Sequence, residues 1–472
     1  MAKSLFRIGG YFVATSSQAA ISFIAVPLLI HALGVAEFGR WGIVEPIIQI
    51  AAQIGLLGIN QGIIKLVNQD GYNPSRAFFS LLKPALPILI GTCLITSLIS
   101  FSVGFSLGNA GFLGILVGAE SLLMLALAGM RAGNIVTGFV AASLLKALGV
   151  LAVLLCNRQF GWPLISSAEQ VVVWWSGISV AGLSVAVVSL SLLARRGERS
   201  QPAGQEHWML YRDSVRYGLP MLISSLLMLA VLNLDRFFLQ HYLDFRQVGE
   251  YVVYVKIANA MNFLVMPVQL WWPTARFNAM KSVDGGQLFF KKSALALVTI
   301  FCVAGFGLWV IAPYLHSYFA PSVTYKKFLM LILIGAMVVY ALSTPLNVGL
   351  LMPGKTHYNM YVIGFSAVVN VILCYFLIPL LGAIGAAIGV LCAQLITLTG
   401  QHYLSQRYYW IDHQYKLIMP AIAVYIVAVI YFQSIFDKSN GLLNFFSYSV
   451  ISLSLALFTF LFWRRQDKGR LV

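Results

Sequence analysis

Residues 293–315 read SALALVTIFCVAGFGLWVIAPYL, a run of 23 residues without a charged side chain. A helix needs about 20 predominantly apolar residues to cross the hydrocarbon core of a bilayer. Similar runs recur along the whole chain, so we expect lipid rather than water to surround most of it. Strands of membrane β-barrels are about 10 residues long and alternate in polarity. The runs found here are longer and continuous, which predicts helices.

The composition agrees with a membrane protein. Of the 472 residues, 60% are hydrophobic and 10% are charged, and the mean hydropathy is +0.84; soluble domains carry about 25% charged residues. Breaks at charged or turn-forming residues delimit fourteen candidate helices, at residues 8–32, 41–67, 80–105, 111–131, 133–155, 170–193, 215–242, 250–272, 293–315, 327–352, 358–379, 384–404, 417–436 and 443–463. We therefore predict an all-α, polytopic membrane protein with about 14 transmembrane helices.

The basic residues predict the topology. The net charge is +16, from 31 Lys and Arg against 15 Asp and Glu. With a cytoplasmic N-terminus, 22 of the 31 fall at cytoplasmic ends and loops, 6 fall outside and 3 lie within spans. Cytoplasmic loops of membrane proteins carry such an excess, so we expect both termini inside. The charge lies between apolar runs, and no nucleic-acid partner is expected.

A polar stretch and an internal repeat predict two lobes. We expect an N-terminal lobe of six helices at 1–194, a cytoplasmic linker at 195–214, a second six-helix lobe at 215–404, and two extra helices with a basic cytoplasmic tail at 405–472. A shift of 210 residues places His31–Trp41 over His241–Tyr251 without a gap, with matching His, Leu, Gly and aromatic positions. Parallel repeats of this kind are typical of transporters with the substrate path between the lobes.

Polar residues form stripes on the helices of both repeated hairpins. In the second predicted helix, Glu45, Gln49, Gln53 and Asn60 fall within a sector of about 80°. The other stripe residues that are candidates for lining a cavity are Gln18, Asn233, Gln240, Asn259 and Asn262. Such stripes either bond neighbouring helices together or line an aqueous cavity, and their repeat-related positions favour the cavity.

Buried charges are the remaining candidates. Glu120 and Lys146 lie about 20 Å from the turn that joins their two helices, on a rise of 1.5 Å per residue. Opposite charges at one depth predict an ion pair, either structural or part of a coupling relay. Asp235 adjoins Arg236, and we expect it to pair with another basic group or to take part in coupling.

The turn after the first helix reads LGVAEFGRWGIV at Leu33–Val44, and the second helix continues as GLLGINQGIIKLV at Gly55–Val67. With fourteen spans and a two-lobe repeat, these stretches resemble the polysaccharide transporter family, the Wzx-type flippases of O-antigen and related lipid-linked oligosaccharides. That family belongs to the multidrug/oligosaccharidyl-lipid/polysaccharide exporter superfamily. The architecture resembles it over the whole chain, whereas the motif is confined mainly to the first two helices.

The resemblance implies a multi-pass protein of the bacterial inner membrane that is not an enzyme and needs no cofactor. It would move an undecaprenyl-pyrophosphate-linked sugar unit, such as an O-antigen repeat of lipopolysaccharide, to the periplasmic face by alternating access. Expected partners are this lipid-linked oligosaccharide, membrane lipids and the polymerase and chain-length proteins of a glycan pathway. An anionic pyrophosphate needs cations within the membrane, so we expect headgroup contacts at Lys65, Lys146, Arg236 and Lys256.

Two alternatives stay open. A cation-coupled multidrug exporter of the same superfamily would use an acidic site such as Glu45 or Glu120, although such exporters usually have twelve spans. A membrane-embedded enzyme of glycan synthesis would need a large aqueous loop with catalytic groups, and the longest loop here has about 20 residues. The five scattered cysteines support neither disulfides nor a metal site. The glycines at 382, 385 and 389 are interpreted as helix-packing positions.

Overall fold

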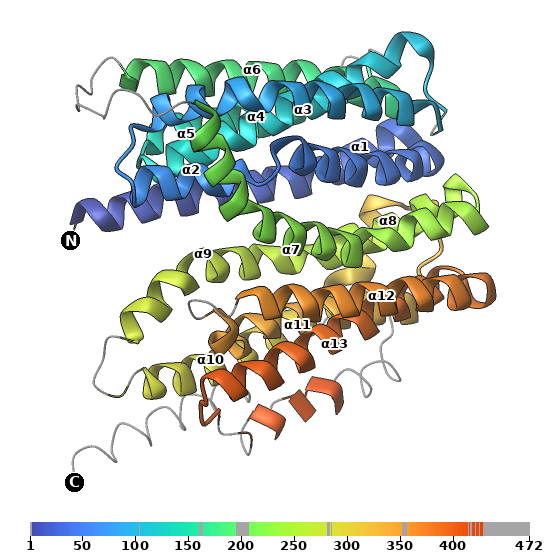
Figure 1. The fold of residues 1–472 in the computed structure, drawn as a ribbon. Helices are drawn as coiled ribbons and strands as arrows, with labels where there is room; N and C mark the ends of the chain where they lie inside the picture. Colours follow the sequence, from blue (N-terminus) through green and yellow to red (C-terminus); the bar gives the residue numbers. More distant parts are fainter. Residues whose placement is uncertain are drawn as a thin grey trace. The chain divides into compact units, whose positions relative to one another are not determined.

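The computed structural model describes residues 2–427, apart from residues 103, 160–163, 195–206, 281–283, 285 and 352–355 and the single positions 414, 416, 417, 421 and 424. All of its regular secondary structure in this part of the chain is helical (Figure 1). Eleven described helices are long and apolar enough to cross a membrane. The all-helical, polytopic membrane fold predicted from the sequence is confirmed.

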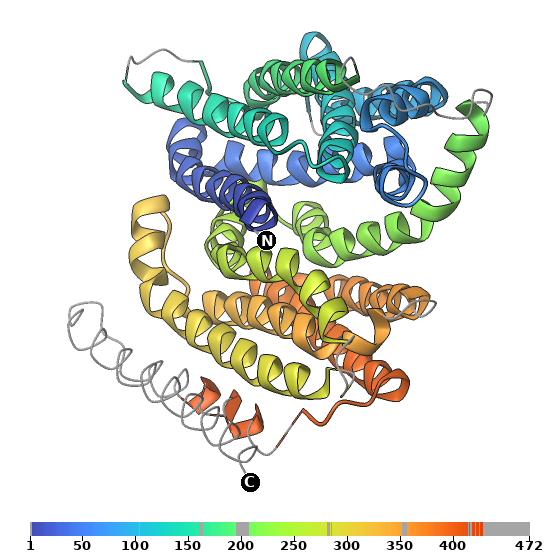
Figure 2. The same ribbon diagram turned by 90° about the vertical axis from the view of Figure 1, so that its left-hand side faces the viewer.

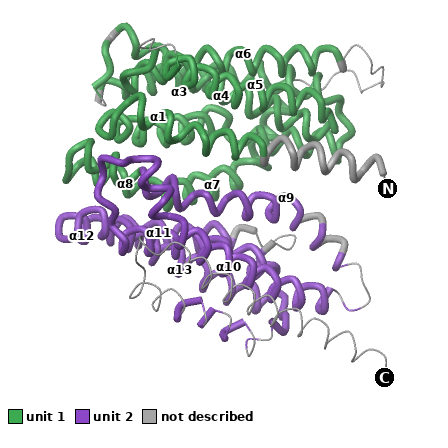
Figure 3. The backbone as a smooth tube through the Cα atoms, turned by 180° about the vertical axis from the view of Figure 1, so that it is seen from behind, with its two compact units in different colours: residues 1–252 green, residues 253–472 purple. Residues whose placement is uncertain are grey.

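The chain divides into two compact units, residues 1–252 and 253–472 (Figure 3). The first unit contains α1 (Ala2–Leu56), α2 (Ile59–Asn68), α3 (Pro74–Ser102), α4 (Leu107–Ala132), α5 (Val136–Gln159), α6 (Ala168–Ala194), α7 (His207–Tyr242) and the first part of α8 (Phe245–Ala258). The second contains the end of α8, η1 (Asn259–Met261), α9 (Asn262–Ala279), α10 (Gln287–Phe319), α11 (Lys327–Leu346), η2 (Val348–Leu351), α12 (Thr356–Leu381) and α13 (Ala383–Tyr408).

The helix α1 holds the first two predicted spans. Fifty-five residues in one straight helix would be about 80 Å long, far more than the roughly 30 Å of hydrocarbon. Gly34 interrupts the helix with φ 72° and ψ 167°, and the two arms of α1 run in different directions (Figure 2). Each arm is long enough to cross the bilayer.

Two of the predicted helices are interrupted. The helix expected at 41–67 is divided between α1 and α2, because Leu57 and Gly58 adopt positive φ values of 45° and 81°. The helix expected at 250–272 is divided by η1 into α8 and α9. Both are the second helix of a repeated hairpin. Each of these two helices therefore contains an interruption, although the two interruptions do not lie at aligned positions.

The ends of the chain are covered only in part. The predicted span at 443–463 and most of the one at 417–436 lie outside the described residues, as does most of the linker predicted at 195–214. Within that linker, α7 already begins at His207. The cytoplasmic location of both termini stays a prediction.

Burial within unit 1 distinguishes lipid-facing from packed surfaces. Side chains from α2 to α6 and the start of α7 form one apolar core, which includes Ile63, Phe78, Leu123 and Ala126. In contrast, the apolar residues Leu94 and Leu98 on α3 are 62% and 67% exposed. Apolar exposure of this extent is expected where the neighbour is lipid.

Unit 2 shows the same pattern. The helices α10 and α11 are buried along most of their length, whereas α12 exposes Tyr361, Phe365 and Phe376. The helices α12 and α13 form a tight hairpin at Gly382, and a Cβ on Gly385 would overlap the backbone of Leu377. Gly385 therefore serves close helix packing, as interpreted from the sequence, whereas Gly382 adopts φ 57° in the turn between the two helices.

Candidate functional site

The polar stripes of α1 and α7 meet within unit 1. The hydroxyl of Ser225 on α7 donates to the side-chain oxygen of Gln53 on α1 at 2.6 Å. Nearer the end of α7, Arg236 bonds to α1 as well. We call this contact, defined by Gly42, Glu45, Gln53, Ser225 and Arg236, the α1–α7 seam. Here the predicted stripes bond two helices together.

Arg236 is the most deeply buried cation of the seam, with 3% of its surface exposed. Its Nη1 donates to the backbone carbonyl of Gly42 at 3.0 Å and lies 3.9 Å from Oε2 of Glu45. The Nε of Arg236 has no hydrogen-bond partner among the described residues. The guanidinium is thus held by one short bond and one longer ion pair.

Asp235 fixes the adjoining turn of α7 to α8. Its carboxylate is 1% exposed, accepts a hydrogen bond from the hydroxyl of Tyr251, and accepts the backbone N–H of Arg236 at 3.0 Å. Tyr251 was not among the predicted site residues, because a tyrosine in an apolar helix carries no distinctive sequence signal.

Glu120 and Lys146 form an ion pair between α4 and α5. The Nζ of Lys146 lies 2.6 Å from Oε1 of Glu120 and donates to Oε2 at 2.7 Å. The hydroxyl of Ser179 on α6 donates to the same carboxylate at 2.6 Å. The carboxylate of Glu120 therefore connects three helices, α4, α5 and α6. It also provides the counter-charge of Lys146.

Lys65 on α2 has a different environment. It is half-buried, and its Nζ lies 5.5 Å from the centre of the Tyr217 ring on α7. A cation over an aromatic face is attracted by the ring quadrupole without being neutralised. The Lys65 ammonium is therefore in contact with an aromatic ring of α7.

In unit 2, the predicted site residues gather at the break between α8 and α9. Lys256 lies in the last turn of α8, Asn259 begins η1 and Asn262 begins α9, and all three are half-buried. About two turns after Asn262, Gln269 donates to the hydroxyl of Tyr340 on α11 at 3.2 Å. The residues that flank η1 on either side keep right-handed helical angles, and a short 3-10 turn inside a longer helix often marks a functional hinge.

The remaining predicted lining residues are scattered along α1, α2 and α7. Gln49 is exposed, Gln18, Asn60 and Gln240 are half-buried, and Asn233 is buried with its amide donating to the Leu229 carbonyl at 2.9 Å. Within unit 1, the three candidate cations Lys65, Lys146 and Arg236 lie on different helices, each with its own local contact.

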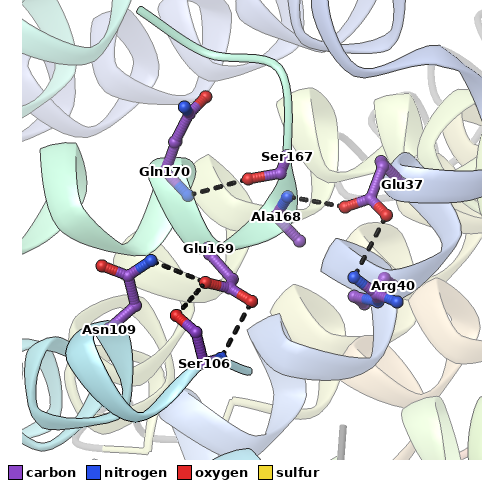
Figure 4. Close-up of polar contacts among 8 residues, drawn as sticks. All are labelled: Glu37, Arg40, Ser106, Asn109, Ser167, Ala168, Glu169 and Gln170. Carbon is purple, nitrogen blue, oxygen red and sulfur yellow. Dashed lines mark hydrogen bonds and ion pairs between the residues drawn. The ribbon is translucent and has the colours of Figure 1, made fainter. Parts of the chain in front are cut away.

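A second polar network joins the starts of α4 and α6 to the part of α1 that follows its break at Gly34 (Figure 4). Glu169 accepts the amide of Asn109 at 2.6 Å and both the hydroxyl and the N–H of Ser106, the residue that precedes α4. Glu37 accepts the N–H of Ala168 at 2.9 Å, at the start of α6, and pairs with Arg40 at 3.2 Å. Carboxylates stabilise helix N-termini because of the free N–H groups there. This network was not predicted from the sequence, although isolated acidic residues near helix ends are a usable signal.

Metal chemistry finds no structural support in the described part of the chain. It contains no group of three or more His, Cys, Asp or Glu side chains placed to hold a metal ion. The five cysteines have free thiols.

Comparisons with known proteins agree with the fold. Residues 7–275 match the model of a family described as polysaccharide biosynthesis protein. The structure of the lipid II flippase MurJ in an inward closed conformation is similar over 96% of this chain and 99% of that one, with 11% identity and a TM-score of 0.56. An inward-facing multidrug resistance MATE family transporter of the MOP superfamily is similar over 83% and 94%, with 14% identity and a TM-score of 0.57. No curated protein matches the sequence.

Proposed function

Because the chain belongs to the polysaccharide biosynthesis protein family, which its residues 7–275 match, we propose that it is a flippase for a lipid-linked oligosaccharide. Its cargo would be an undecaprenyl-pyrophosphate-linked unit, such as an O-antigen repeat, carried from the cytoplasmic to the periplasmic face of a bacterial inner membrane by alternating access. The family match carries this proposal, and the fold shared with a lipid flippase and with MATE transporters supports it.

The cations of the chain suit such a cargo. Hydrocarbon strongly disfavours the charge of a pyrophosphate, whereas the prenyl tail is readily accommodated in lipid. Lys65 and Lys256 are both half-buried and lie next to an interrupted helix. We propose each as a separate candidate contact of the pyrophosphate, Lys65 with Asn60 in unit 1 and Lys256 with Asn259 and Asn262 in unit 2, the asparagines serving as donors and acceptors for sugar hydroxyls.

The other two predicted headgroup contacts are weaker candidates. Lys146 is compensated by Glu120 at 2.6 Å, and Arg236 is 3% exposed and bonded to a backbone carbonyl. The guanidinium of Arg236 is thus buried, and the ammonium of Lys146 already has a carboxylate partner.

The proposal is tested in proteoliposomes that contain the purified protein and a fluorescent prenyl-pyrophosphate-linked saccharide. Protein-dependent transfer of the saccharide between leaflets is measured by quenching with a membrane-impermeant reductant. We expect Lys65→Gln and Lys256→Gln each to slow transfer by about tenfold, the effect of roughly 1.4 kcal/mol on the barrier. The matched control Lys83→Gln removes an exposed lysine on α3 and should retain the parental rate.

The same liposomes separate the flippase from the exporter. A protein that leaves the saccharide in its original leaflet but drives accumulation of a cationic dye against an imposed proton or sodium gradient is a multidrug exporter. That result would overturn the proposed cargo. It would leave the membership of the family and the fold unchanged.

A further inference from the structure

Pro46 leaves one carbonyl of α1 without its usual donor. In an α-helix, the carbonyl of Gly42 would accept the N–H of residue 46, but proline has none. Pro46 lies inside α1, where the helix continues through it. The Nη1 of Arg236 occupies the Gly42 carbonyl instead, at 3.0 Å. Because membrane helices must satisfy backbone groups internally, Arg236 compensates the defect that Pro46 creates.

The same segment of α1 packs against α8 at a pair of glycines. A Cβ built on Gly39 would overlap the carbonyl of Phe245 and lie 2.7 Å from the backbone N of Gly249. Conversely, a Cβ built on Gly249 would overlap the carbonyl of Val35 and lie 3.1 Å from the backbone N of Gly39. We call this contact the Gly39–Gly249 crossing.

The crossing joins positions that the internal repeat makes equivalent. Gly39 and Gly249 differ by 210 residues, and so do Gly42 and Val252, where a Cβ on Gly42 would lie 2.7 Å from Cγ2 of Val252. The two hairpins therefore meet around a local two-fold axis, with backbone against backbone. The side chains at this crossing include Val252, packed on Gly42, and Arg40, whose guanidinium lies 5.3 Å from the centre of the Phe245 ring. A further polar contact would therefore strengthen it.

Arg236 is placed to supply that contact. Asp235 is bonded to Tyr251 on α8 and to the N–H of Arg236, which fixes the α7 turn to the α8 side of the crossing. The Arg236 side chain then reaches across to Gly42 on the α1 side. Glu45, with Oε2 3.9 Å from Nη1, offers the guanidinium a second partner one helical turn further along α1.

We propose that Arg236 is the latch of the Gly39–Gly249 crossing. It holds the crossing closed by bonding the backbone carbonyl that Pro46 leaves open. The crossing opens when the guanidinium releases this carbonyl and stays paired only with the longer, rotatable side chain of Glu45, which lets α1 move away from α8. No bare charge arises in this exchange, because the carboxylate takes over as the carbonyl is released. The proposal concerns the motion of the two hairpins and holds for either class of cargo.

The test uses a cysteine reporter inside the crossing. Val252 is fully buried against Gly42, so Val252→Cys in a protein with its five native cysteines replaced reports opening through its rate of maleimide labelling. The measurement is made in proteoliposomes without any cargo, so it does not depend on the proposed function. Asp70→Cys, at an exposed position, confirms that the reagent reaches every variant.

Pro46→Ala is the decisive variant, because it gives the Gly42 carbonyl a donor from its own helix and removes the need for Arg236. We expect it to label Val252→Cys at least fivefold faster than the parent. Pro27→Ala, a change of the other proline inside α1, is the matched control and should label at the parental rate. A parental labelling rate in Pro46→Ala, or an equal acceleration in Pro27→Ala, would overturn the latch.

A second comparison tests the route through Arg236. Arg236→Gln should accelerate labelling at least tenfold when Pro46 is present, but less than threefold in the Pro46→Ala background, where the bond is already weakened. Independent, multiplicative effects of the two changes would overturn the proposal. Pro46→Ala restores a regular helical bond and is not expected to impair folding, so the first comparison stands even if Arg236→Gln unfolds.

Discussion

Lys146 and Arg236 are both cations on apolar helices of unit 1, yet they are compensated in different ways. The ammonium of Lys146 lies 2.6 Å from Glu120, a carboxylate that also accepts a hydrogen bond from Ser179. The guanidinium of Arg236 lies 3.9 Å from its carboxylate, Glu45, and its short bond goes to a backbone carbonyl.

The difference separates a structural charge from an exchangeable one. In a medium of low dielectric constant, a close ion pair is costly to break because it leaves two uncompensated charges. A cation bonded to a neutral carbonyl, with a carboxylate slightly further away, can change partners without ever losing compensation. Removing each partner in turn therefore tests whether the two sites differ as described.

The largest effect is expected at the close pair. Glu120→Gln leaves the partly buried Lys146 without its counter-charge, and we expect a loss of about 2–3 kcal/mol in the free energy of unfolding, somewhat below that of a fully buried pair. Lys146→Met in the same protein removes the stranded charge and should recover most of the loss. Unfolding in mixed micelles of increasing SDS fraction measures both. If the double variant is no more stable than Glu120→Gln, the pair is not the reason for the loss.

The packing beside Arg236 should be the next most sensitive. Gly39→Ala and Gly249→Ala each place a methyl group on opposing backbone, and backbone cannot rotate away as a side chain can. We expect a loss of about 2 kcal/mol for each, measured in the same SDS titration. Gly177→Ala on α6, where a Cβ meets nothing within 4 Å, is the control and should be neutral or slightly stabilising. Equal stability of all three variants would contradict the close crossing.

Arg236 itself should matter less for stability than Glu120. Arg236→Met leaves the Gly42 carbonyl without a donor, a loss of about 1–2 kcal/mol, and Pro46→Ala in the same protein should recover part of it. The SDS titration again measures both variants. A loss as large as that of Glu120→Gln would show that Arg236 is a fixed ion pair of the same kind as Lys146.

The sequence predicted one of these two sites better than the other. Equal distances of Glu120 and Lys146 from a shared turn were enough to predict an ion pair, because helical rise is regular. The partner of Arg236 is a backbone carbonyl, which no residue type reveals, although Pro46 four residues after Gly42 is a signal that could have been used. The second donor to Glu120, Ser179, lies on another helix, and its contact depends on packing that periodicity does not specify.

The fold was also predicted only in part: the membrane helices were predicted, and their interruptions were not. Long apolar runs identify membrane helices, and the shift of 210 residues identified the pairs that meet at the Gly39–Gly249 crossing. The interruptions at Gly58 and at Asn259–Met261 were not predicted, since both lie within continuous apolar runs. Gly58 is a small residue that also packs against the backbone of Gly218, and a lone glycine in an apolar run does not distinguish a break from close packing.

Unit 2 contains a buried histidine, His413, that differs from both cations. Its burial favours the neutral form of the ring, so it needs no counter-charge. The ring of His413 is fully buried, and neither of its nitrogens has a hydrogen-bond partner among the described residues. His402 lies 5.3 Å away between ring centres and bonds the hydroxyl of Tyr415 at 2.7 Å, while Asp412 pairs with Lys291 at 2.8 Å. Burial, reinforced by the neighbouring His402, lowers the pKa of His413 from 6.5 to about 4, against a smaller opposing effect of Asp412.

This base should produce the smallest effect, confined to the segment around residues 409–415. Between pH 6.5 and about 4, His413 binds a proton when the segment is undocked but not when it is docked, so acidification across this range favours undocking. We expect amide hydrogen exchange in the segment, corrected for intrinsic rates, to be several-fold faster at pH 5.5 than at pH 7.5. His413→Leu keeps an apolar side chain in place and should remove this pH dependence. A dependence that persists in His413→Leu would have to come from the other ionisable groups that face the segment, which are His402, Tyr415, Asp412 and Lys291.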